Sequence, residues 1–119
     1  MTYSFSFTFF VTSGTGRRVG VANLENLADE LMHAMTERET DMVFDSSVGG
    51  VLTAGEIDVE VTVEAASEGP AAAIARDFII ESIKATGGTP MGIFVFPPKR
   101  PRKMPRQEWH ERRAELTNA

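Results

Sequence analysis

The chain of 119 residues contains 42% hydrophobic residues and no cysteine, and its formal net charge is −5. This length and apolar content suit one domain with its own core, and the lack of cysteine excludes disulfides, thiolate metal sites and cysteine nucleophiles. Residues 1–98 hold 5 basic and 14 acidic residues, a net of −9, whereas residues 99–119 hold 7 basic and 3 acidic ones, a net of +4. We therefore expect an acidic domain over residues 1–98 and a basic, proline-rich tail over residues 99–119.

Residues 3–12 form the clearest predicted strand. Aromatic residues and valine occupy the odd positions, and serine or threonine occupies the even ones apart from Phe10. Such alternation is typical of a strand with one buried face. Because so aromatic a segment would aggregate at a sheet edge, we expect it to lie centrally in the sheet.

The N-terminal segment does not have the pattern of a secretion signal, because it lacks a basic start and a continuous apolar block. No apolar run in the chain approaches the roughly 18–20 residues that a membrane-spanning helix needs. Together with the lack of cysteine, these features predict a cytoplasmic protein without a membrane partner.

A glycine-rich stretch, residues 14–20, separates this strand from a predicted helix with leucines at helical spacing and Asn23 as its N-cap. Backbone N–H groups at such a position can bind an anion. The residues of this candidate anion site are Gly14, Gly16, Arg17 and Arg18. Their spacing matches neither the dinucleotide-binding motif nor the P-loop.

Two further strands are predicted on either side of Gly49 and Gly50, which suit a two-residue hairpin turn. In the earlier strand, Met42, Phe44 and Val48 would share the buried face. In the later one, apolar residues at positions 57, 59, 61 and 63 alternate with outward-facing, mostly acidic residues. The outward acidic positions are Glu56, Asp58, Glu60 and Glu64.

A second helix is predicted from Gly69 and Pro70 to about Ala85, and a fourth strand over residues 91–96. The order βαββαβ is the split βαβ arrangement of ferredoxin-like folds. Right-handed crossovers then give a four-stranded antiparallel sheet of strand order 4-1-3-2, with both helices on one face. The predicted fold class is α+β, a ferredoxin-like sandwich followed by the basic tail.

Within this topology, the glycine-rich loop resembles the phosphate cradle of acylphosphatases in its position. The resemblance covers residues 18–23 only. The arginine that those enzymes use near the start of the first helix has no counterpart here, and neither does their asparagine on the second strand. Acylphosphatase chemistry is therefore not expected.

The tail is rich in proline, which keeps a segment extended and lowers the entropy lost when it docks. A short helix could begin near Pro105, with Trp109 and Leu116 on one side. Trp109, the only tryptophan, is predicted to be a buried anchor. Its candidate sockets are a patch around Ile80, the sheet face near Phe10, and another chain.

The sheet face that the helices leave open would carry the acidic positions of the third strand. RNA-binding modules of the same topology stack bases on aromatic residues there, but these carboxylates would repel phosphate. We expect either a solvated face or a docking surface for a basic partner, including the chain's own tail. The predicted partner-binding residues are Glu56, Asp58, Glu60, Glu64, Phe10, Ile80, Lys99, Arg100, Arg102, Lys103, Arg106 and Trp109.

The sequence predicts no catalytic residue, metal ligand or cofactor, because His33 and His110 fall in no recognisable triad or metal-binding pattern. The favoured function is a small, non-enzymatic protein-interaction module whose tail docks on an acidic surface of its own, of another subunit or of a partner. Tail exchange would then give a homo-oligomer. The alternatives are a nucleic-acid accessory protein that binds phosphate through its tail, and a small anion-binding enzyme or sensor that uses residues 14–20.

Overall fold

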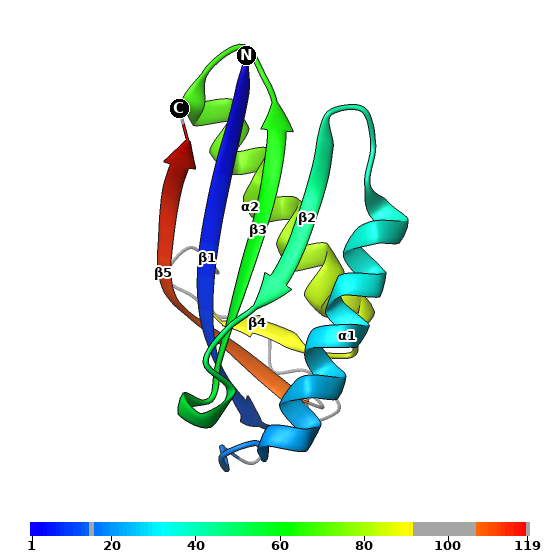
Figure 1. The fold of residues 1–119 in the computed structure, drawn as a ribbon, viewed down its shortest axis with the longest axis vertical. Coiled ribbons are helices and arrows are strands. Elements are labelled where there is room, and N and C mark those ends of the chain that lie inside the picture. The colour runs from blue at the N-terminus through cyan, green and yellow to red at the C-terminus, as the bar shows by residue number, and fades with distance from the viewer. Residues whose placement is uncertain (15, 92–106, 119) are drawn as a thin grey trace.

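In the part of the chain that the structure describes, five strands in one sheet and two α-helices make up the fold. The structure is a computed structural model that describes residues 1–14, 16–91 and 107–118. The elements are β1 (Thr2–Ser13), α1 (Val21–Arg38), β2 (Val43–Gly49), a short 3₁₀ helix η1 (Leu52–Ala54), β3 (Glu56–Glu64), α2 (Glu68–Ala85), β4 (Thr89–Met91) and β5 (Gln107–Asn118). The sheet is mixed and curled, with strand order β2-β3-β1-β5-β4, and β4 runs parallel to β5 (Figure 1). The α+β class is as predicted.

β1 lies at the centre of the sheet, as its composition predicts. It pairs antiparallel with β3 on one side and with β5 on the other. Its odd-numbered side chains from Tyr3 to Val11 are at most 7% exposed and form the middle of the core. The two neighbours satisfy the backbone of β1 on both sides, so this aromatic strand presents no free edge for aggregation.

β1 has β3 on one side, and the strand on its other side is not the predicted one. Of the predicted fourth strand, residues 91–96, all but Met91 lie outside the described residues. The short β4 that contains Met91 runs along β5, parallel to it and at the edge of the sheet. β5 takes the place beside β1, so the predicted four-stranded antiparallel sheet is wrong, although its neighbours 1-3-2 are found as predicted.

Residues 107–118 are thus a strand, and the helix considered for the tail is wrong. Trp109 and Leu116 do lie on one side, because they pair with Val11 and Phe5 of β1. Their spacing is seven residues rather than six because a β-bulge between the pairs of Thr8 and Phe9 adds one residue to β5. A spacing of seven is also that of one helix face, which explains why the sequence pattern resembles a helix.

β2 contains another irregularity, between Phe44 and Ser47, where Asp45 has a φ of 52°. Because this bulge shifts the alternation by one residue, Val43 and Val48 both pack toward the core, and Phe44 faces the other way. The predicted shared face of Met42, Phe44 and Val48 is therefore wrong. The predicted two-residue turn is also wrong, since residues 50–55, including η1, connect β2 to β3.

Both helices pack on the face of the sheet that carries the odd-numbered residues of β1 and β3, and in Figure 1 α2 passes behind these strands. α1 begins at Val21 with Gly20 as its N-cap, so Asn23 lies inside the first turn instead of capping it. α2 ends at Ala85 and is followed by Gly87 with a φ of 86°, close to the predicted end. The buried helix residues are Leu24, Leu27, Leu31, Ala34, Met35, Ala71, Ala75, Ile79, Ser82 and Ile83.

Trp109 completes the core from β5. It is 0% exposed, and its ring meets the ring of Phe9 edge-on, with the centroids 5.9 Å apart. The chain passes close to the indole at Gly88, where an added Cβ would lie 2.5 Å from Trp109 Nε1 and 3.2 Å from Ile83 Cγ2. The absence of a side chain at Gly88 is therefore a condition for burying Trp109.

We predict that Gly88→Ala destabilises the fold by about 1–3 kcal/mol, because the new methyl group overpacks the indole site. Gly69→Ala is the matched control, since nothing lies within 4 Å of its Cβ position in the first turn of α2. Alanine favours helix there, so this control should be neutral or stabilising by up to about 1 kcal/mol. Urea unfolding followed by circular dichroism measures both; equal stabilities would contradict the close contact at Trp109.

Candidate interaction surface

The face of the sheet opposite the helices is built from the even-numbered residues of β1 and β3 and from their neighbours on β5. Ser4, Ser6, Thr8 and Phe10 of β1 each have a partner on both sides, which gives rows that run across three strands. The charged rows are Asp58–Thr8–Arg113, Glu56–Phe10–His110 and Glu60–Ser6–Glu115. We call this three-stranded surface the open face.

One side of the open face is an acidic stripe on β3, made of Glu56, Asp58, Glu60 and Glu64. Glu60 is exposed and the other three are half-buried. Asp58 accepts a hydrogen bond of 2.7 Å from Thr8 Oγ1, and Glu64 forms an ion pair of 2.9 Å with the N-terminal amine. The structure thus places the four predicted carboxylates along one strand and one face.

The other side of the open face carries cations from β5, which the sequence assigns to the tail. Arg112 is stacked on Phe10, with its guanidinium carbon 4.9 Å from the ring centroid. Arg113 is exposed and lies 3.4 Å from the carboxylate of Glu115. His110 is 3.2 Å from Thr12 Oγ1 and 3.5 Å from Glu108. β3 therefore contributes carboxylates and no cation to the face, whereas β5 contributes Arg112, Arg113 and His110 together with the carboxylates of Glu108 and Glu115.

A polar contact from the helical layer also fixes β5. Arg76 of α2 donates to Glu111 Oε1 at 3.1 Å, and its guanidinium lies 5.6 Å from the ring centroid of Phe7. The side chain of Glu111 is only 8% exposed, so its carboxylate is largely withdrawn from water and Arg76 is the cation that pairs with it. Arg76 and Glu111 are 35 residues apart, and the sequence contains no spacing pattern that would have paired them.

The structure describes the predicted anchor, Trp109, but not the predicted basic segment, residues 99–106. Trp109 is buried in this chain, against Phe9 on the helix-covered face and not against Phe10 on the open face. Ile80 is half-buried on α2. The cations predicted to bind a partner all lie outside the described residues: Lys99, Arg100, Arg102, Lys103 and Arg106. The described contribution of the tail to the open face is thus β5.

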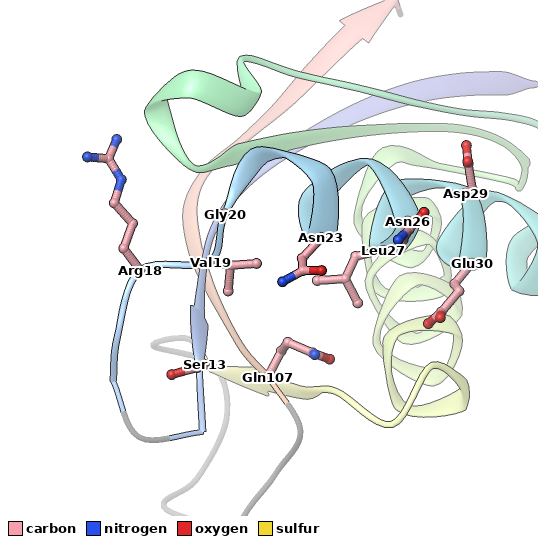
Figure 2. Close-up of a pocket in the computed structure, with 10 residues that line it drawn as sticks. All are labelled: Ser13, Arg18, Val19, Gly20, Asn23, Asn26, Leu27, Asp29, Glu30 and Gln107. Atoms are coloured by element: carbon pink, nitrogen blue, oxygen red, sulfur yellow. The ribbon is translucent and has the colours of Figure 1, made fainter.

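A cavity of about 620 Å³ lies between the start of α1, the glycine-rich loop and the start of β5. Figure 2 shows Asn23, Leu27 and Gln107 extending toward it and Arg18 pointing away. Arg18 instead donates to the Thr53 carbonyl at 2.7 Å. Of the four predicted anion-binding residues only Arg18 lines this cavity, and carboxylates of Asp29 and Glu30 line it too, so the cavity offers an anion little positive charge.

The described residues provide few groups for catalysis. His33 lies on the exposed surface of α1, 3.0 Å from Glu37. Among residues 1–14, 16–91 and 107–118, no group of three His, Cys, Asp or Glu side chains could hold a metal ion. No helix in this part of the chain is both long and apolar enough to cross a membrane.

Comparison of the chain with family models, with curated proteins and with solved structures yields no match.

We predict that Arg76→Gln lowers the free energy of unfolding by about 1–3 kcal/mol, because it leaves the buried Glu111 carboxylate without its cation. The control is Lys84→Gln on the same helix, which removes a 3.5 Å pair with Glu81 whose side chains are 57% and 63% exposed. This control should change stability by less than about 0.5 kcal/mol. Denaturant titration tests both variants; equal, small effects would show that α2 does not fix β5 through this pair.

Proposed function

We propose that the protein is a non-enzymatic protein-interaction module that binds its partner through the open face by charge complementarity. The observation that carries the proposal is the division of charge across β3, β1 and β5, with Asp58 and Arg113 on opposite sides of Thr8. The finer description of the fold belongs to the same proposal: a ferredoxin-like variant, located in the cytoplasm, in which β5 occupies the place of the fourth strand.

The acidic stripe is not required by the packing of the core. Its residues alternate with the buried residues of β3, so Glu56, Asp58 and Glu60 follow one another at about 7 Å along the strand. That is within the Debye length of about 8 Å at physiological salt, so the carboxylates repel one another. A partner that places cations over β3 and carboxylates over β5 would relieve this repulsion, and it would gain specificity from the order of the charges.

The alternative functions find less support among the described residues. On β5 the cations Arg112 and Arg113 are flanked by Glu111 and Glu115, so they do not form the continuous positive surface that phosphate binding needs. A nucleic-acid role would rest on residues 99–106, outside the described part. An anion-binding role for residues 14–20 would need Arg18 to leave the Thr53 carbonyl.

The experiment that tests the proposal places a photo-crosslinking amino acid on the open face in the native host. Ser6 is suitable, because it lies on the central strand between Glu60 and Glu115. The control position is Ala73, which is exposed on α2. We expect irradiation to give a discrete covalent adduct from position 6 and none from position 73.

The acidic stripe should be necessary for that adduct. Combining the crosslinker at position 6 with Glu56→Gln and Asp58→Asn should remove the adduct and leave the melting temperature unchanged or higher, because two repelling charges are lost and the asparagine keeps an acceptor for Thr8. Neutralising Glu25 and Glu37, exposed on α1, provides the control with equal charge change. An adduct that is insensitive to the stripe, or the absence of any adduct, would refute the proposed function.

A further inference from the structure

We infer that the partner of the open face is a second copy of this chain, stacked face to face about a two-fold axis parallel to β1. The inference rests on the proposed function and adds the identity and the orientation of the partner. It follows from the order of charges across the three strands, which brings Asp58 opposite Arg113 under this rotation but not under the two-fold rotation perpendicular to the strands.

Rotation about an axis parallel to β1 exchanges the two flanking strands. The β3 strand of one copy then lies over β5 of the other, while β1 lies over β1. This rotation leaves the position of each row along the strand axis unchanged. Asp58 therefore faces Arg113 of the other copy, and Glu56 faces His110 and Arg112. Each contact occurs twice, as in any isologous interface.

A two-fold axis in the plane of the interface but perpendicular to the strands gives the opposite result. It places β3 over β3, and the acidic stripes of the two copies would then meet. Like charges brought together and desolvated carry a large penalty. Charge therefore selects the axis along β1 for a pair of copies.

The centre of the open face permits close approach of two sheets. β1 presents the small hydroxyl side chains Ser4, Ser6 and Thr8 there, between the two charged sides. Thr8 is 6% exposed, and its hydroxyl is already bound to Asp58. The Ser4 hydroxyl is likewise paired, with that of Thr62 at 2.9 Å. Stacking would thus leave no polar group of Ser4 or Thr8 newly unsatisfied.

One row opposes the arrangement and limits its strength. Glu60 faces Glu115 of the other copy, although Glu115 lies 3.4 Å from its own Arg113, which reduces the repulsion. Three strands over eight residues cover roughly 26 Å by 14 Å on each copy, which in total is below the roughly 1,200 Å² at which standard specific interfaces begin. We therefore expect a weak, salt-sensitive dimer with a dissociation constant in the micromolar range.

The experiment is a charge exchange followed by sedimentation of the full chain. Asp58→Arg alone places two guanidinium groups opposite each other in this row, and Arg113→Asp alone places two carboxylates opposite each other. Each variant should therefore dimerise about tenfold more weakly or worse. An equimolar mixture of the two should recover dimers. In each heterodimer the two arginines of one copy, at positions 58 and 113, face the two aspartates of the other. Asp77→Arg, exposed on α2, is the control and should dimerise like the parent.

Circular dichroism checks that each variant is folded. If either reversal unfolds the chain, the pair Glu56→Arg and Arg112→Glu tests the neighbouring row with the same expected recovery in the mixture. A parent that stays monomeric at millimolar concentration, or a mixture that fails to recover dimers, would overturn the inference. The two proposals are distinguished by the adduct from Ser6: a mass of twice the chain supports self-association, whereas an adduct with another protein retains the proposed function and rejects the second copy.

Discussion

The antiparallel pairing of β5 with β1 is the contact on which the rest of the molecule depends. Ten register pairs join the last described segment of the chain to the first strand. One of these pairs places Trp109 beside Val11, and the indole also contacts the ring of Phe9. Without β5, the aromatic β1 would be an edge strand with an unsatisfied backbone, and the core would lose its largest fully buried side chain. The same strand satisfies the sheet, fills the core and, through Glu111, attaches to α2 by way of Arg76. The composition of residues 99–119 suggests a separate basic tail. From residue 107 onward, however, this segment is part of the folded core.

This pairing also determines how charge is arranged on the surface. In the sequence, acidic and basic residues are separated along the chain, with a net of −9 before residue 99 and +4 after it. In the sheet, β1 stands between the two groups, so the separation along the chain becomes a separation across one face. The cations of β5 do not lie on top of the acidic stripe, because backbone pairing places them beside β1 and at the same level as the carboxylates. Asp58 and Arg113 are thus held apart by Thr8: Asp58 accepts a hydrogen bond from Thr8, and Arg113 lies beside Glu115 of its own strand.

The elements that sequence reasoning predicts correctly are those with uninterrupted periodicity. β3 alternates without a break, β1 does so apart from Phe10, and the leucines of α1 follow helical spacing, so their buried faces can be deduced from residue order alone. β2 and β5 each contain a bulge, and one extra residue is enough to place Phe44 on the wrong face or to make Trp109 and Leu116 resemble one side of a helix. Local pattern cannot reveal this, because a bulge is stabilised by the partner strand. The acidic stripe could be predicted because it follows directly from the regular alternation of β3. The cations opposite it could not be predicted, since their position depends on pairing between the two ends of the chain, as between Thr8 and Arg113.

The position of β5 determines whether two copies of the open face can attract each other. A face that carried only the acidic stripe would repel its own copy in every orientation, and stacking two such faces would desolvate like charges. Once Arg112, Arg113 and His110 share the face, the repulsion depends on orientation, and rotation about β1 turns the principal contacts into attractions. The surface then specifies a partner by the order of its charges and not by apolar area, which is consistent with the hydroxyl-rich centre of β1. Because β5 also supplies Trp109 to the core, deleting the end of the chain would damage the fold and the surface together. Substitutions of single exposed charges separate the two roles, since Arg113 faces outward and Trp109 faces inward on the same strand.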